Sequence, residues 1–257
     1  MKAFSAVIIT YNEEKNIGRC LESVKGLADE IVVVDSVSTD RTKEICLQYG
    51  VVFIEQPFLG YVEQKNFALR KASNDYVLSL DADEALDDEL RKSILAEKQK
   101  SFPADGYEMN RLSTFCGQWI KHGTWYPDRK LRLLNRHKAK WGGTNPHDKI
   151  IMQESAVKAH VKGDILHYTY NSIDEIISQT NRFTSLQSQE MFKQGKRSSV
   201  FKLLLNPIWA FISGYIIKQG FLDGYNGFLI ARYASYSTFI KYSKLLHIQK
   251  QARLNNG

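Results

Sequence analysis

The sequence predicts an α/β fold with a mostly parallel central sheet, helices on both of its faces, and a C-terminal helical appendage. Strand and helix signals alternate through residues 1–100. The predicted strands are continuous apolar runs, which is typical of parallel strands that helices cover on both sides. Residues 196–257 are both apolar and basic. We therefore expect one large domain over 1–195, with halves of about 1–100 and 101–195, and a separate helical region over 196–257.

Each element of the first half is predicted by its spacing of apolar residues. The strands are runs rich in β-branched residues, and the helices carry apolar residues three and four positions apart. We expect strands at 3–10, 30–36, 51–56 and 75–81, and helices at 14–26, 38–50, 61–72 and 87–100.

The second half of the large domain changes character, because loops rich in glycine and aromatic residues separate short strand-like pieces. A strong helix follows over 172–195, where Ser172 and Glu175 predict a capping box and Gly195 ends the helix. The short strands are expected at 106–113, 129–136, 148–152 and 164–170.

The positive charge of the chain lies at its end. The net charge is +7, and from Lys193 onward ten Lys and Arg residues accompany a single acid, Asp223. This predicts an anionic partner surface for the tail, and the tail's apolar content favours lipid over nucleic acid. Three scattered cysteines, Cys20, Cys46 and Cys116, predict neither a disulfide framework nor a zinc site and indicate a reducing, cytoplasmic compartment.

Residues 198–246 are apolar on nearly all sides of their predicted helices. Lys202 and Lys218 bracket fifteen residues that include Pro207 and Gly214, which is short for a membrane span. Flanking Lys, Arg, Trp and Tyr residues favour a helix that lies in a membrane interface. The alternative is a helical hairpin that packs on protein.

Polar side chains follow three of the predicted strands. In parallel sheets, ligands bind beyond the carboxyl ends of the strands, so we expect these groups to meet at one edge. They are Thr10, Tyr11, Asn12 and Glu13 after the first strand, Asp35, Ser36, Ser38 and Asp40 after the second, and Asp81 and Asp83 after the fourth.

The acids Asp81 and Asp83 have two interpretations. Alternation along an extended segment points both side chains the same way, and the small Ala82 between them leaves room for a ligand. Such a pair can hold a divalent cation against a diphosphate. Acids before a helix are as often caps. The position of Asp35 supports the interpretation as a ligand site. Residues 38–40 are better placed to cap the next helix, which leaves Asp35 free to bind a ligand.

Four blocks appear in order over residues 6–86: VIITYNEEKNIGRCLESV, EIVVVDSVSTDRT, QKNFAL and YVLSLDADE. Together they resemble inverting glycosyltransferases of family 2, which have the GT-A nucleotide-diphospho-sugar transferase fold. YPDRKLRLLNR and NPHDKI extend the match. The C-terminal GFLDGYNGFLIARYASYSTFIKYSKL is similar to small bacterial members that add sugars to the lipopolysaccharide inner core. The resemblance implies a hexosyltransferase with a nucleotide-sugar donor, such as a UDP-hexose, and a glycolipid or oligosaccharide acceptor.

The resemblance also implies roles for individual residues. Asp83 would hold Mg²⁺ or Mn²⁺, Asp81 would contact the metal or the ribose, and Asp35 would bind uracil or ribose. Lys65 would approach the diphosphate, although an exposed helix lysine is the other interpretation. Glu84 would begin the next helix rather than bind a ligand. The donor-binding set is Thr10, Tyr11, Asn12, Glu13, Asp35, Ser38, Lys65, Asp81, Ala82 and Asp83.

A catalytic carboxylate is expected downstream of the acid pair and distant from it. Asp148, beside His147 in NPHDKI, fits this role, although similar proteins usually have Glu there, and a polar turn before a strand is the alternative. Arg129 and Arg132 would give their strand a basic face that contacts a diphosphate or an anionic acceptor, and His147 is a third candidate for such a contact. A solvated edge strand is the other interpretation.

We therefore expect an inverting single displacement in which a carboxylate base takes the acceptor proton and a metal offsets the charge of the departing diphosphate. The enzyme would act in lipopolysaccharide and cell-envelope biosynthesis, as a peripheral protein on the cytoplasmic face of the inner membrane. Two alternatives are a nucleotidyltransferase, which the lack of a glycine-rich phosphate loop after the first strand disfavours, and a non-catalytic nucleotide-sugar-binding protein.

Overall fold

The computed structural model describes residues 1–144 and 147–254 of the chain. The chain divides into two compact units. The first comprises Met1–Leu112 and Asp128–Tyr168, and the second comprises Ser113–Pro127 and Thr169–Gly257. The predicted boundary at residue 195 therefore lies inside the second unit.

The parallel sheet predicted from the first hundred residues is present. Its strands are β1 (Phe4–Thr10), β2 (Glu30–Asp35), β3 (Val52–Glu55) and β4 (Tyr76–Asp81), in the order β3-β2-β1-β4, and each neighbouring pair is parallel. Thr10 pairs with Asp35 and Ile9 pairs with Asp81, so the last residues of three strands lie at one level.

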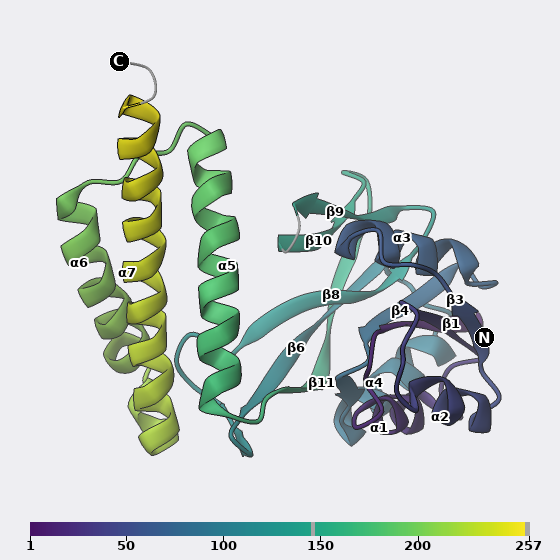
Figure 1. Ribbon diagram of the computed structural model, residues 1–257. Coiled ribbons are helices and arrows are strands. Elements are labelled where there is room, and N and C mark those ends of the chain that lie inside the picture. Colours follow the sequence, from purple (N-terminus) through teal and green to yellow (C-terminus); the bar gives the residue numbers. More distant parts are fainter. Residues whose placement is uncertain (145–146, 255–257) are drawn as a thin grey trace. The chain divides into compact units, whose positions relative to one another are not determined.

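Helices cover both faces of this sheet, as the apolar strands predict. Figure 1 shows α3 on one side and α1, α2 and α4 on the other. Alternate residues of β1 serve the two faces, since Phe4 and Ile8 belong to the cluster that contains α1 and α4, whereas Val7 packs with Ala68 of α3. The bounds are α1 Ile17–Val24, α2 Thr42–Gln48, α3 Tyr61–Lys71 and α4 Asp88–Gln99.

Antiparallel strands extend the sheet beyond β4, which makes the whole sheet mixed. The order continues β4-β8-β6-β11-β5, with β7 paired to β6, while β9 and β10 form a separate two-stranded sheet. The bounds are β5 Glu84–Leu86, β6 Gly106–Phe115, β7 Gln118–Trp119, β8 Asp128–Asn135, β9 Ala139–Thr144, β10 His147–Met152 and β11 Lys158–Tyr170.

Strand β8 lies between β4 and β6, so the interpretation of residues 129–136 as a solvated edge strand is wrong. Its pairing with β6 contains a bulge. Leu133 pairs with Tyr107 and Leu131 pairs with Glu108, so the register on β6 skips Arg132. A bulge re-aims the side chain of the extra residue, and Arg132 is 3% exposed whereas Arg129 is exposed.

The second unit is mainly helical. It contains α5 (Ile173–Lys193), α6 (Val200–Ile212) and α7 (Gly224–Leu254), and α7 packs against both of the others (Figure 1). A π-helical turn (Ser213–Ile217) and a 3₁₀ turn (Gly220–Asp223) connect α6 to α7. The predicted start of α5 is confirmed, because Ser172 Oγ accepts a hydrogen bond from the Glu175 backbone N–H.

Candidate active site

The loops that follow β1 and β2 are joined by hydrogen bonds. The backbone N–H of Asn12 donates to Ser38 Oγ at 2.8 Å, and the backbone N–H of Thr39 donates to Asn12 Oδ1 at 2.8 Å. Asn12 has a φ of 53°, in the left-handed region that Asn tolerates better than most residues. Tyr11 remains 59% exposed beside them. Of the predicted donor residues, Asn12 and Ser38 thus shape the loops, and Tyr11 presents an accessible ring.

Asp35 is buried and already has partners. Its carboxylate accepts hydrogen bonds from the backbone N–H and the hydroxyl of Ser38. The expectation that Asp35 is left free is therefore wrong. Because each carboxylate oxygen has two lone pairs, Asp35 retains capacity for a further donor.

Glu13 lies among the acids of the strand ends. Its side chain accepts a hydrogen bond from Asn16 Nδ2 at 2.8 Å. Burial raises the pKa of Glu13, and the carboxylates of Asp83, Asp40 and Asp81 raise it further against the opposing Asn16 bond. An arriving cation would relieve this repulsion.

Asp81 is held by two cations. Lys65 Nζ lies 3.1 Å from its Oδ1, and Arg132 lies 3.3 Å from its Oδ2. Burial alone would raise the pKa of Asp81, but Lys65 and Arg132 together hold it well below its usual range. The interpretation of Lys65 as an exposed helix lysine is wrong, because its side chain is only 5% exposed.

Glu84 does not begin a helix. It lies in β5, its side chain is fully buried, and it receives Arg132 at 2.7 Å and the backbone N–H of Asp81 at 3.1 Å. Helix α4 is instead capped by Asp87, which accepts from the Leu90 N–H. Arg132 therefore binds protein carboxylates on both sides rather than sharing a basic face with Arg129. This pairing of Arg132 with Glu84 was not predicted from the sequence.

Asp83 is paired with a residue that the motif analysis missed. His167 Nε2, on β11, lies 3.2 Å from Asp83 Oδ2, and the Tyr168 N–H donates to the Asp83 carbonyl oxygen at 2.9 Å. The pairing arises because β5 continues from the acid pair and runs antiparallel to β11, with Glu84 opposite His167. A histidine within the predicted strand 164–170 was the available signal.

The side chain of Ala82 faces the core rather than a ligand. It is 3% exposed and belongs to the apolar cluster that contains Cys20 and Leu21 of α1. The limit on its size therefore comes from packing against α1, and the expectation that it leaves room for a ligand is wrong.

Asp148, the predicted base, is close to the acid pair and not distant from it. Its Oδ2 lies 2.8 Å from Lys65 Nζ, so Lys65 stands between Asp148 and Asp81. Asp148 lies in β10, opposite Gly143 of β9, so the polar-turn alternative is wrong. The side chain of His147 and residues 145–146 of the same motif lie outside the described residues.

Metal ligands are not preassembled in the described part of the chain, where no three His, Cys, Asp or Glu side chains form a ready cluster. A partial set does exist. Asp83 and His167 are in contact. Asp81 Oδ1 is buried and accepts no hydrogen bond from the described residues, although the Lys65 ammonium lies 3.1 Å from it. Carboxylate oxygens suit Mg²⁺ and Mn²⁺, and a neutral imidazole is a common metal ligand, so these residues fit a divalent cation.

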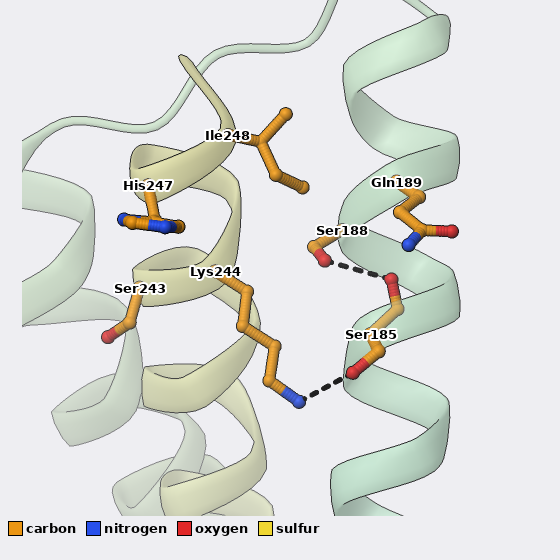
Figure 2. Close-up of a pocket in the computed structure, with 7 residues that line it drawn as sticks. All are labelled: Ser185, Ser188, Gln189, Ser243, Lys244, His247 and Ile248. Carbon is orange, nitrogen blue, oxygen red and sulfur yellow. Dashed lines mark hydrogen bonds between the residues drawn. The ribbon is translucent and has the colours of Figure 1, made fainter. Parts of the chain in front are cut away.

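An open groove of about 440 Å³ lies elsewhere, between α5 and α7 of the second unit (Figure 2). Lys244 Nζ there donates to Ser185 Oγ and Thr184 Oγ1 and to the carbonyl of Asn181, which ties α7 to α5. Burial lowers the pKa of Lys244. The ammonium group of this lysine is therefore engaged in hydrogen bonds within the helical unit. The groove is lined by Ser185, Ser188, Gln189, Ser243, Lys244, His247 and Ile248, none of them predicted site residues.

Known proteins match this chain in sequence and in fold. The sequence model of the family described as "Glycosyl transferase family 2" matches residues 5–160. An uncharacterised glycosyltransferase of Rickettsia typhi is 34% identical over 98% of this chain and 90% of its own. The lipopolysaccharide core biosynthesis glycosyltransferase LpsC of Rhizobium meliloti is 31% identical over 94% of this chain and 91% of its own.

Among solved structures, the mannosyltransferase PcManGT from Pyrobaculum calidifontis, in complex with GDP-Man and Mn²⁺, superposes with a TM-score of 0.56. The match covers 95% of this chain and 87% of that one at 15% identity, which supports the GT-A fold alone.

Proposed function

Because the chain belongs to glycosyl transferase family 2, we propose that this glycosyltransferase moves a hexose from a nucleotide-diphospho-sugar, with UDP-hexose the first candidate, to a glycolipid of the lipopolysaccharide-core type. The name of the similar LpsC protein supports the acceptor class. The sequence blocks that resemble the family support the donor class.

One structural observation carries the proposal. Asp35, Asp81 and Thr10 end three neighbouring parallel strands at one level, and Asp83 follows directly. Acidic groups that converge beyond the carboxyl ends of parallel strands are arranged to receive a nucleotide diphosphate with its cation. The buried Asp35 would accept hydrogen bonds from ribose or base, and the exposed ring of Tyr11 would lie beside the nucleotide.

Asp83 and His167, with Asp81, would hold Mg²⁺ or Mn²⁺. When bound, the cation would offset the negative charge that gathers on the departing diphosphate. The small number of protein ligands is consistent with Mg²⁺, which usually binds one or two carboxylates and completes its coordination shell with water and phosphate oxygens. Tyr168 and β5 fix the backbone of Asp83 and thereby hold its carboxylate in place.

Asp148 is the proposed general base. The acceptor hydroxyl oxygen attacks the anomeric carbon from the face opposite the diphosphate and gives its proton to the Asp148 carboxylate. The bond from the anomeric carbon to the phosphate oxygen breaks, and the nucleoside diphosphate leaves with the electron pair. This single displacement inverts the configuration of the anomeric carbon.

The relatives favour this class over the two alternatives. Both curated relatives described above are named glycosyltransferases. A nucleotidyltransferase and a non-catalytic binding protein would share the acidic edge, but neither would need a base such as Asp148.

We also propose that the second unit attaches to an anionic membrane. Helix α6 and the turns after it expose a row of large apolar side chains, here called the α6 face: Phe201, Leu204, Leu205, Ile208, Trp209, Ile216, Ile217, Phe221 and Leu222. By length and composition alone, Val200–Ile217 could also cross a membrane. Lys202 and Lys218 and the lack of acids between them favour attachment at the interface of the cytoplasmic leaflet.

The donor assignment is tested by thermal shift with a panel of nucleotide sugars, each with Mn²⁺, with Mg²⁺ and with chelator. A ligand that binds only the folded protein raises its melting temperature, so the true donor should stabilise the protein in the presence of metal. Transfer is then measured with that donor on lipopolysaccharide-core acceptors. A panel without any stabilising nucleotide sugar would contradict the proposal.

A further inference from the structure

Lys65 is one cation shared by two carboxylates with different predicted tasks. Its Nζ lies 2.8 Å from Asp148 Oδ2 and 3.1 Å from Asp81 Oδ1. Asp81 belongs to the proposed diphosphate and metal edge, and Asp148 is the proposed base. The proposed base is therefore engaged in an ion pair with Lys65.

The position of Lys65 is fixed by its surroundings. Nζ lies 4.4 Å from the centroid of the Trp141 ring, and the side chain is almost fully buried. The neighbouring Asn66 binds the backbone of Trp141 twice, through its Nδ2 to the carbonyl oxygen at 2.9 Å and through its Oδ1 from the N–H at 3.0 Å. Helix α3 is thus hydrogen-bonded to β9, and β9 pairs with β10, the strand that carries Asp148.

Arg132 secures Asp81 independently of Lys65. It contacts Asp81 at 3.3 Å and Glu84 at 2.7 Å. If Lys65 turned toward another anion, Asp81 would keep Arg132 at 3.3 Å. Among the described residues, Lys65 alone lies within ion-pair distance of Asp148, and Arg132 attracts Asp148 from farther away. Loss of Lys65 would therefore weaken the electrostatic stabilisation of the Asp148 carboxylate more than that of the Asp81 carboxylate.

We propose that the donor diphosphate and Asp148 compete for Lys65. Donor binding at the Asp81 edge draws the ammonium toward the phosphate oxygens and releases Asp148 Oδ2 for the acceptor hydroxyl. Lys65 is then a positioning residue that masks the base until a donor is present. It also faces the diphosphate when that group gains negative charge on departure. This inference rests on the proposed function, because it takes Asp148 as the base and the Asp81 edge as the donor site.

Competition of this kind has a thermodynamic consequence. A ligand that must displace an internal partner binds with an affinity reduced by the population of the occupied state. Removing the charge of Asp148 should free Lys65 and tighten nucleotide binding, by about three- to tenfold for a coupling of roughly 1 kcal/mol. A residue that acts only as a base would leave this affinity unchanged.

The test is a double-mutant cycle on the full-length protein, with UDP and MnCl₂ titrated by calorimetry in the absence of acceptor. The four proteins are wild type, Asp148→Asn, Lys65→Met and the double variant. Asp148→Asn should bind UDP more tightly, and the gain should vanish when Lys65 is Met. Lys65→Arg, which keeps the charge, should retain the gain. Lys98→Met is the matched control, because Lys98 also forms a short ion pair, at 2.7 Å with Asp29.

Each outcome has a distinct meaning. An equal gain in both backgrounds would show a general effect of removing negative charge and would overturn the competition. If Asp148→Asn tightened UDP binding in neither background, the competition would be overturned as well. The assignment of Asp148 as the base would then be judged separately, from the turnover of Asp148→Asn. No UDP binding by the wild type would overturn the donor assignment and this inference together. Circular dichroism of each variant verifies folding, and Lys65→Gln replaces Lys65→Met if the latter does not fold.

Discussion

His167 Nε2 lies 3.2 Å from Asp83 Oδ2, although one residue belongs to the last strand of the first unit and the other follows β4. The contact exists because β5 is a strand that pairs with β11 immediately after the acid pair. The acidic edge therefore includes an imidazole from a distant part of the chain.

Replacing His167 should weaken the binding of the metal. His167→Asn would remove a nitrogen ligand beside Asp83, and we expect the Mn²⁺ concentration for half-maximal UDP binding to rise about tenfold or more, as for perturbed metal sites generally. Calorimetry at varied Mn²⁺ measures this. His137→Asn is the control, since His137 also contacts an aspartate, Asp75 at 2.8 Å, at an exposed place. Equal metal dependence in both variants would exclude His167 as a ligand.

Replacing Asp148 should slow the chemical step. Asp148→Asn keeps the shape of the side chain but cannot take a proton, so kcat should fall by about 10²-fold or more, in the range of general-base effects. The KM for the donor should not rise. Initial-rate kinetics with saturating acceptor separate the two constants. Glu97→Gln, which weakens a 2.7 Å pair with the exposed Lys100, should leave kcat unchanged. Normal turnover in Asp148→Asn would place the base elsewhere.

Neutralising Glu13 should stabilise the fold at neutral pH. Burial and the neighbouring carboxylates raise the pKa of Glu13 in the folded state, so its ionised form is disfavoured there relative to the unfolded chain. The cost is complete above the raised folded pKa, shrinks as pH falls through it, and is gone below the unfolded pKa of about 4.3. Glu13→Gln should therefore raise the free energy of unfolding at pH 7 and lose that advantage near pH 4.

Urea unfolding without metal, repeated across this pH range, measures the difference. Glu22→Gln is the control, because Glu22 is an exposed acid of α1. An advantage of Glu13→Gln that persisted at pH 4 would show that electrostatics is not its cause.

Polar substitutions on the α6 face should release the protein from membranes. Phe201 and Trp209 are 75% and 63% exposed, and burying such a side chain in lipid is worth about 1.5–3 kcal/mol. Phe201→Ser with Trp209→Ser should lower partitioning into anionic vesicles by about tenfold or more in a flotation assay. Leu47→Ser on α2, 57% exposed, is the control. Unchanged flotation would refute attachment through the α6 face.

Alkaline carbonate distinguishes the two modes of attachment. A helix that lies in the interface is released by carbonate washing, whereas a spanning helix is retained. We expect release.

The parallel half of the fold was predictable because its signals are local. Each of β1 to β4 is an apolar run that ends in polar residues, and parallel order alone places Thr10, Asp35 and Asp81 at one edge. Nothing in that inference requires knowledge of distant contacts.

The rest of the site depends on pairings between distant segments, which no local pattern reveals. Glu84 follows two acids and precedes a helix, so it resembles a cap, yet its pairing with β11 buries it against Arg132. Arg132 was expected to share a basic face with Arg129, and a bulge turned it inward. The pair of Lys65 with Asp148 requires that β10 reach α3, which depends on Asn66 and Trp141.

The order of residues in the second unit bears on synthesis at the ribosome. Ser113–Pro127 emerges long before Thr169–Gly257, yet both segments form that unit, and Phe115 and Ile120 share an apolar cluster with Ile176 and Ile230. Domains generally fold as units during synthesis, so the first unit can close once Tyr168 has emerged. The apolar side chains of Ser113–Pro127 then remain partly uncovered until α7 has been synthesised. A nascent chain that stops before Ile230 would leave these side chains more exposed, which makes termination before that residue a hazard for aggregation as well as for activity.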